Sequence, residues 1–163
     1  SLGPSIENLL GHLRYGTLYL LAGLGRSVAS FWFTGVRSPS IGASGAIYGL
    51  FGAWVVIGRR LNIDLTQVLG LIAINIVIGF IVPNVDWRAH LGGLVTGAIV
   101  AAVFVYAPAR GRTAVQVVGV VVVVALLVAA TVVRDAAITA DPAVQAFLAQ
   151  EGQFWKDLDP GLG

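Results

Sequence analysis

The chain has 163 residues, of which 57% are hydrophobic and only 11% are charged, and its mean hydropathy is +0.87. A soluble domain of this size would carry about a quarter charged residues, so the composition predicts an integral membrane protein. The net charge of +2 is too small to indicate a nucleic-acid partner. The sequence contains no cysteine, which excludes disulfides, thiolate metal sites and a cysteine nucleophile. We find no metal-ligand cluster and no phosphate-binding loop, and we expect no metal and no cofactor.

The N-terminal third begins with residues 1–14, which are rich in turn-forming residues and predict a polar connection. The first membrane span is expected at about residues 15–34, and Arg26 interrupts it. An arginine at that depth is costly unless it faces protein or water, or reaches the membrane surface. A loop at residues 35–41 then leads to the second span.

The second span, at about residues 42–58, begins with the segment GASGAIYG and places Ser44 in its first turn. The backbone N–H groups there have no partners from a preceding turn, and the helix dipole favours negative charge. Ser44 can therefore act as a nucleophile whose own N–H points at an oxyanion. Packing is the alternative, because small residues in membrane helices usually serve close helix contact. Three of them recur at every fourth position: Gly45, Gly49 and Ala53.

The third span is expected at about residues 67–82, after a short loop at residues 61–66 in which Asn62 or Asp64 can cap the helix. The fourth span, at about residues 87–106, follows Asp86 as its predicted N-cap.

The fourth span carries a second stripe of small residues, at Ala89, Gly93 and Gly97, and His90 lies beside it. A histidine in such a place often joins helices by a hydrogen bond to a carbonyl. An ionisable side chain inside a membrane segment nevertheless indicates function. Two helices that meet along their stripes would bring the hydroxyl of Ser44 and the imidazole of His90 within hydrogen-bonding distance.

The C-terminal part holds a fifth span at about residues 114–133, which is rich in valine and alanine and carries no candidate chemistry. Asp141 and Pro142 then predict the N-cap and the first residue of a further helix. Apolar residues follow at roughly helical spacing, so we expect an amphipathic helix along the membrane surface, with a flexible polar tail as the alternative.

The arginines predict the orientation of the spans. Because five spans alternate in direction, one side holds Arg14, Arg59, Arg60, Arg110 and Arg112, and the other holds Arg37, Arg88 and Arg134. The excess places the first side in the cytoplasm. Ser44 and His90 then open two helices at similar depth, just below the non-cytoplasmic surface.

Together these motifs resemble the rhomboid family of intramembrane serine proteases. GASGAIYG at residues 42–49 is similar to the family's Gly-x-Ser-Gly helix, and AHLGGLVTG at residues 89–97 is similar to its Ala-His-x-x-Gly-x-x-x-Gly helix. Residues 3–11, with the Arg14-Tyr15 pair after them, resemble the segment that joins the second and third core helices. The resemblance covers residues 2 to about 107.

The resemblance implies an all-α, polytopic bundle in a bacterial plasma membrane, and we expect the sequence to be the later part of a longer protein. Residues 1–107 would be a partial core with the third to sixth core helices. Residues 108–134 would add a transmembrane helix, and residues 135–163 would form the polar tail. The implied partners are the lipid bilayer and membrane-protein substrates, whose peptide bonds are cut in or near transmembrane segments.

The resemblance also assigns roles. Ser44 would be the nucleophile and His90 the general base, and Tyr48 would pack against the imidazole, with simple core packing as its alternative. Gly42 and Gly45 flank the serine. Asp86 is a candidate third member, which would orient the imidazole; we prefer the capping role, because the family uses a Ser–His pair.

The oxyanion site is where the sequence departs from the family. Rhomboids supply side-chain donors, a histidine and an asparagine, from the helix before the Gly3-Pro4 segment, and that helix is not in this chain. His12 is expected on the cytoplasmic side, far from Ser44, whose N–H is left as the principal visible donor. Losing one oxyanion donor can cost about two to three orders of magnitude in rate. The alternatives are an inactive fragment, a non-cleaving binder of membrane clients, and a transporter or structural membrane bundle whose stripes serve packing only.

Overall fold

The computed structural model describes residues 2–34, 44–82 and 86–158, with no description of the side chains of residue 34 and residues 155–158. Every regular element in these ranges is an α-helix, which confirms the all-α prediction. In chain order they are α1 (Leu2–Leu10), α2 (His12–Thr34), α3 (Ser44–Leu61), α4 (Thr66–Ile81), α5 (Trp87–Tyr106), α6 (Arg112–Thr139) and α7 (Pro142–Leu158).

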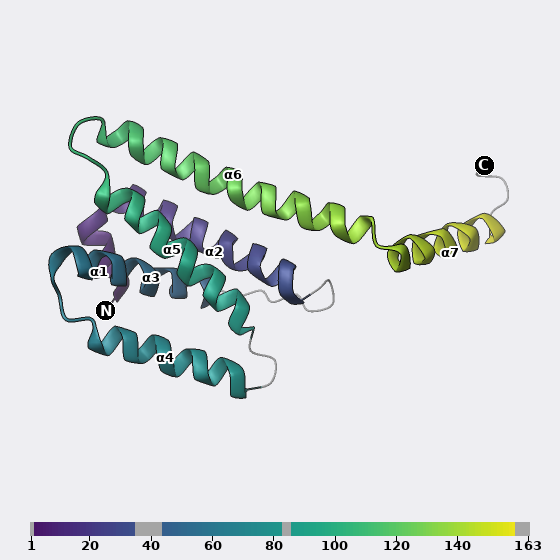
Figure 1. The fold of residues 1–163 in the computed structure, drawn as a ribbon, viewed down its shortest axis with the longest axis horizontal. Coiled ribbons are helices and arrows are strands. Elements are labelled where there is room, and N and C mark those ends of the chain that lie inside the picture. The colour runs from purple at the N-terminus through teal and green to yellow at the C-terminus, as the bar shows by residue number, and fades with distance from the viewer. Residues whose placement is uncertain (1, 35–43, 83–85, 159–163) are drawn as a thin grey trace.

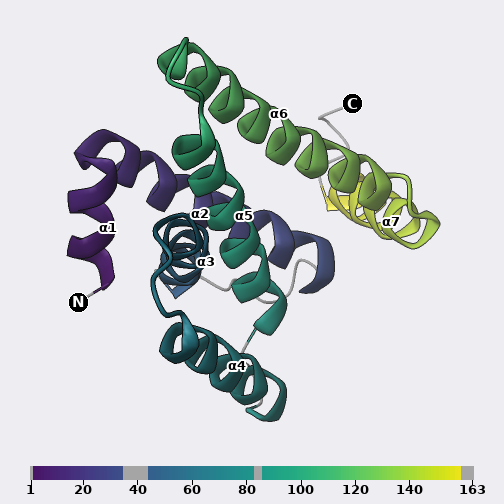
Figure 2. The same ribbon diagram turned by 60° about the vertical axis from the view of Figure 1, so that its left-hand side comes forward.

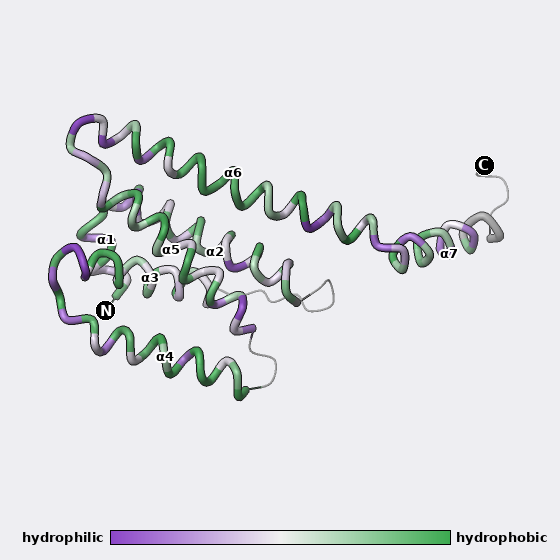
Figure 3. The backbone as a smooth tube through the Cα atoms, in the orientation of Figure 1, coloured by the Kyte–Doolittle hydropathy of each residue, from purple (hydrophilic) through white to green (hydrophobic). Residues whose placement is uncertain are grey.

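Helices α5 and α6 are long and apolar enough to cross a membrane, judged by length and composition among the described residues. Helix α4 is apolar but shorter, with 16 residues. Figure 3 shows that hydrophilic residues gather at the α3–α4 and α5–α6 connections and in α7, whereas α6 is hydrophobic along most of its length. The chain is thus an integral membrane protein by composition, and the number of five spans stays a prediction.

Helices α2, α3 and α5 form the centre of the bundle (Figure 1). Helix α1 packs on α2 and α3, and α6 lies along α2 and α5. Figures 1 and 2 both show α4 on the opposite side of this centre from α6, and Figure 1 shows α7 extending beyond the end of α6.

The two stripes of small residues meet, as predicted. A Cβ atom at Gly93 would overlap the carbonyl oxygen of Gly45, and one at Gly97 would overlap that of Gly49. Helices α3 and α5 are therefore in backbone contact, which only glycine permits at these positions. Helix α2 joins this contact through Ala22, whose Cβ occupies the space beside Gly49.

The prediction of a polar connection at residues 1–14 is wrong, because α1 is a helix and α2 begins at His12. Leu2, Ile6 and Leu10 recur at every fourth position, and they bury one face of α1 in the core. Gly11 separates the two helices with a φ of 83°, a backbone conformation that glycine adopts without strain.

Other boundaries agree with the predictions more closely. Helix α5 has the expected ends, and α6 is longer than residues 114–133 because polar residues after the apolar run continue the helix. The N–H of Ala143 donates to Asp141 Oδ1 over 2.8 Å, so Asp141 caps α7 as expected. The N-cap residue of α4 is instead Leu65, which makes no side-chain cap. Asp64, one residue earlier, accepts from the N–H of Thr66 over 2.9 Å. The predicted loop at residues 35–41 lies outside the described residues.

Candidate active site

The site lies at one end of the bundle, where α3 and α5 both begin (Figure 1). Ser44 is the first residue of α3, and His90 lies in the first turn of α5. His90 Nε2 is 3.3 Å from Ser44 Oγ, which is a slightly long hydrogen bond. The predicted proximity of the two side chains is therefore present, and the backbone contact between Gly45 and Gly93 holds the two helix starts at this separation.

Tyr48 lies one turn after Ser44 and covers the imidazole of His90. Its ring stacks on the His90 ring with centroids 4.2 Å apart and an interplanar angle of 4°. Tyr48 is buried, whereas Ser44 and His90 are half-buried. The stacking fixes the plane of the imidazole, so that Nε2 faces the Ser44 hydroxyl.

Asp86 caps α5, which is the role that we preferred from the sequence. Its Oδ1 accepts from the N–H of Ala89 over 3.1 Å, and its Oδ2 accepts from the hydroxyl of Ser30 over 2.6 Å. The carboxylate thus joins the start of α5 to α2. The sequence analysis did not identify Ser30 as a partner of Asp86. Ala22, Arg26 and Ser30 recur at every fourth position, which places them on one face of α2 and could have indicated this role.

Arg26 faces protein, which answers the question raised by an arginine at this depth. Its side chain is only 6% exposed. The aliphatic part of that side chain occupies the space that a Cβ atom at position 45 would need. Its charge acts electrostatically on His90, as does that of Asp86. The arginine of α2 therefore requires a glycine at position 45, and the carbonyl of Gly45 in turn requires a glycine at position 93 of α5. Gly42 lies outside the described residues.

His12 lies at the other end of the bundle, at the start of α2 (Figure 1). It is exposed, and its Nδ1 is 2.6 Å from Glu7 Oε1. Its position far from Ser44 is as predicted. Across the described ranges, no three histidine, cysteine or acidic side chains gather into a group that could hold a metal ion.

Comparisons with known proteins identify the family. A family model described as the rhomboid domain matches residues 1–107. The chain is 41% identical over 107 residues to the rhomboid protease GluP of Bacillus subtilis (strain 168), a match that covers 63% of this chain and 21% of that protein. It is 37% identical over 118 residues to RHOMBOID-like protein 1 of Arabidopsis thaliana, covering 68% of this chain and 30% of that protein.

RHOMBOID-like protein 6, mitochondrial, also of Arabidopsis thaliana, is 38% identical over 117 residues, which cover 67% of this chain and 37% of that protein. The chain thus spans only 21–37% of the length of these relatives. No solved structure matches the chain. The family model matches well over half of the chain and includes both Ser44 and His90. The chain therefore belongs to the rhomboid family.

Proposed function

We propose that this chain carries the Ser–His pair of an intramembrane serine protease, with Ser44 as the nucleophile and His90 as the general base. The observation that carries the proposal is the distance of 3.3 Å between Ser44 Oγ and His90 Nε2. Family membership supports the same chemistry, since the similar protein of Bacillus subtilis is a rhomboid protease by name. The site faces the non-cytoplasmic side if the arginines orient the bundle as they predict.

In this proposal His90 Nε2 takes the proton of the Ser44 hydroxyl as the oxygen attacks the substrate carbonyl. The imidazolium then donates that proton to the departing amine. Water attacks the acyl-enzyme, with His90 again acting as the base, and releases the second product. Tyr48 keeps the imidazole in plane through the stacked contact of 4.2 Å.

The tetrahedral oxyanion needs hydrogen-bond donors, and the first turn of α3 supplies backbone N–H groups that have no partner within the helix. The N–H of Ser44 is the donor closest to the reacting oxygen. The matched part covers only 21% of the similar Bacillus subtilis protein. The family resemblance implies side-chain donors from a helix that precedes residue 3, and we propose that these donors would complete the oxyanion site. This chain alone would then cleave slowly or not at all.

The proposed substrates are transmembrane segments of other membrane proteins. A peptide bond inside a regular helix is hydrogen-bonded and shielded, so the segment must leave its helix to reach Ser44. Segments with small or helix-breaking residues near their outer ends do so at the lowest cost. The family resemblance implies the same preference.

The test compares cleavage of a model transmembrane substrate by the chain and by a form extended at its N-terminus. In the form that cleaves, Ser44→Ala and His90→Ala should each abolish cleavage without lowering the unfolding temperature. Ser27→Ala is the matched control, because the Ser27 hydroxyl donates to the carbonyl of Gly23 within its own helix. Cleavage that survives Ser44→Ala would refute the assignment of the nucleophile, and a failure of both forms to cleave would favour a non-cleaving binder of membrane clients.

A further inference from the structure

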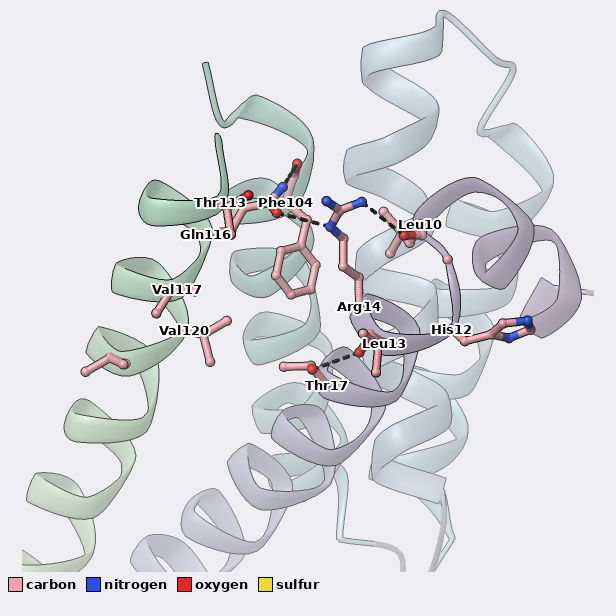
Figure 4. A pocket seen from close by; sticks show the side chains of 12 residues that line it. Leu10, His12, Leu13, Arg14, Thr17, Phe104, Thr113, Gln116, Val117 and Val120 are labelled. Carbon is pink, nitrogen blue, oxygen red and sulfur yellow. Dashed lines mark hydrogen bonds between the residues drawn. The ribbon is translucent and has the colours of Figure 1, made fainter. Parts of the chain in front are cut away.

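Arg14 lies in the first turn of α2, at the end of the bundle opposite the candidate active site (Figure 1). Figure 4 shows the hydrogen bonds that hold its side chain in place. Its Nε donates to Gln116 Oε1 over 3.1 Å, and its Nη1 donates to the carbonyl of Leu10 over 3.4 Å. Both of these partners are neutral. These two hydrogen bonds therefore fix the guanidinium of Arg14 without neutralising its positive charge.

Gln116, which orients Arg14, is itself fixed. It is 6% exposed, and its Nε2 donates to the carbonyl of Phe104 over 2.9 Å. That carbonyl would ordinarily accept from the N–H four residues later, but residue 108 is a proline and has none. Gln116 supplies the missing donor, so α5, α6 and Arg14 are joined in one chain of hydrogen bonds.

Two cavities adjoin Arg14. One, of about 680 Å³, lies between the start of α2 and the start of α6 (Figure 4), and the other, of about 280 Å³, is lined by Arg14, Arg60 and Arg112. Arg60 also lies over the ring of Tyr106, with its guanidinium carbon 5.8 Å from the ring centroid. Three arginines from three helices thus surround one small space.

The three arginines have no acidic partner among the described residues that line this space. Neither cavity has an aspartate or a glutamate among its described lining residues. The nearby carboxylate of Glu7 is engaged by His12 Nδ1 over 2.6 Å. Three cations around a space without a carboxylate favour an anionic ligand.

Away from Arg14 the larger cavity is mostly apolar, although His12, Thr17 and Thr113 also line it. Val117, Val120 and Val121 of α6 face Leu13 and Thr17 of α2 across it. Val117 and Val121 are 56% and 59% exposed, so the slot opens onto the surface that α6 presents outward. A ligand that fills both cavities must join an anionic group to an apolar chain.

We propose that the two cavities form a binding site for one anionic phospholipid. The headgroup phosphate lies among Arg14, Arg60 and Arg112, and an acyl chain lies in the slot between α2 and α6. Basic pockets between helices at a membrane surface are the setting in which anionic headgroups bind. Arginine suits this task, because its planar fork matches phosphate geometry.

The test measures binding of dioleoyl phosphatidylglycerol and dioleoyl phosphatidylcholine to the purified protein in an uncharged detergent. The two lipids have identical chains, so the difference between their dissociation constants isolates the headgroup charge. Phosphatidylglycerol should bind more tightly. Arg60→Gln and Arg112→Gln should each weaken its binding about fivefold. The binding of phosphatidylcholine should weaken less, because the choline ammonium offsets the charge of its phosphate.

Arg59→Gln is the matched charge control, because Arg59 lines a different cavity, beside Asp64. Val117→Trp should block the slot and weaken the binding of both lipids, whereas Val128→Trp, three turns further along the same face of α6, should not. Equal binding of the two lipids, equal losses in Arg59→Gln and Arg60→Gln, or equal losses in the two tryptophan variants would overturn the proposal. Displacement of phosphatidylglycerol by millimolar inorganic phosphate would overturn it too, because the ligand would then be a free anion.

Discussion

The substitution Gly93→Ala tests whether backbone contact between α3 and α5 sets the geometry of the candidate site. The new Cβ atom would overlap the carbonyl oxygen of Gly45, which is backbone and cannot rotate away. To restore ordinary contact the two helices must separate by about 1 Å at this level. The distance of 3.3 Å between His90 Nε2 and Ser44 Oγ leaves no room for such a shift within hydrogen-bonding range.

Two effects then follow, and they differ in size. Overpacking of this kind costs about 1–3 kcal/mol of stability, and the better helix propensity of alanine offsets about 1 kcal/mol of that. A displacement of about 1 Å at reacting groups costs about a hundredfold in rate. We therefore expect cleavage to fall much further than the unfolding temperature does.

The assay is cleavage of a model transmembrane substrate by whichever form cleaves it, this chain or the form extended at its N-terminus, with thermal unfolding measured on the same samples. Gly70→Ala on α4 is the matched control, because a Cβ atom there would meet nothing within 4 Å. It should keep full activity. Wild-type cleavage by Gly93→Ala would refute the argument that this contact positions the site.

Three further substitutions probe hydrogen bonds that the fold depends on, each read by thermal unfolding. Ser30→Ala removes the bond of 2.6 Å to Asp86 and should cost about 1.5 kcal/mol, so an unchanged unfolding temperature would contradict the joining of α2 to α5. Gln116→Leu leaves the carbonyl of Phe104 without its donor and should cost about 1–3 kcal/mol. The pKa of Asp64 lies below its usual value because the carboxylate accepts two hydrogen bonds from the first residue of α4. Its stabilising contribution is present above the usual pKa and is lost as the pH falls through the lowered value, so acidification below about pH 4 should destabilise the wild type more than Asp64→Asn.

Much of the fold could be predicted, because the apolar composition of membrane helices and the residues that cap them are visible in the sequence. Helix α5 was predicted with its observed ends, since Asp86 marks its start and Pro108 its end. Helix α1 was missed because a glycine and a proline near its start outweighed the spacing of Leu2, Ile6 and Leu10. A proline in the first turn of a helix removes only an N–H that would have no partner.

The candidate site could be predicted as far as side chains are placed by helix starts and small-residue stripes. The proximity of Ser44 and His90 follows from two such stripes that meet. The position of Arg26 could not be predicted. Its hydropathy says only that burying an arginine in a membrane span is costly. The direction of its side chain depends on which neighbouring helix leaves space for it. That space is the missing side chain of Gly45, on a different helix.

The hydrogen bond from Gln116 to the carbonyl of Phe104 affects where the protein can be truncated. The family match ends at residue 107, just before the proline that deprives α5 of its last helical donor. The family match therefore ends before the part of the chain that satisfies the last carbonyl groups of α5. A chain shortened to the matched region would retain every recognised motif and leave a backbone oxygen without its donor. In this protein α6 supplies the donor that the end of the preceding helix lacks, so a replacement for α6 would need a donor at the position of Gln116.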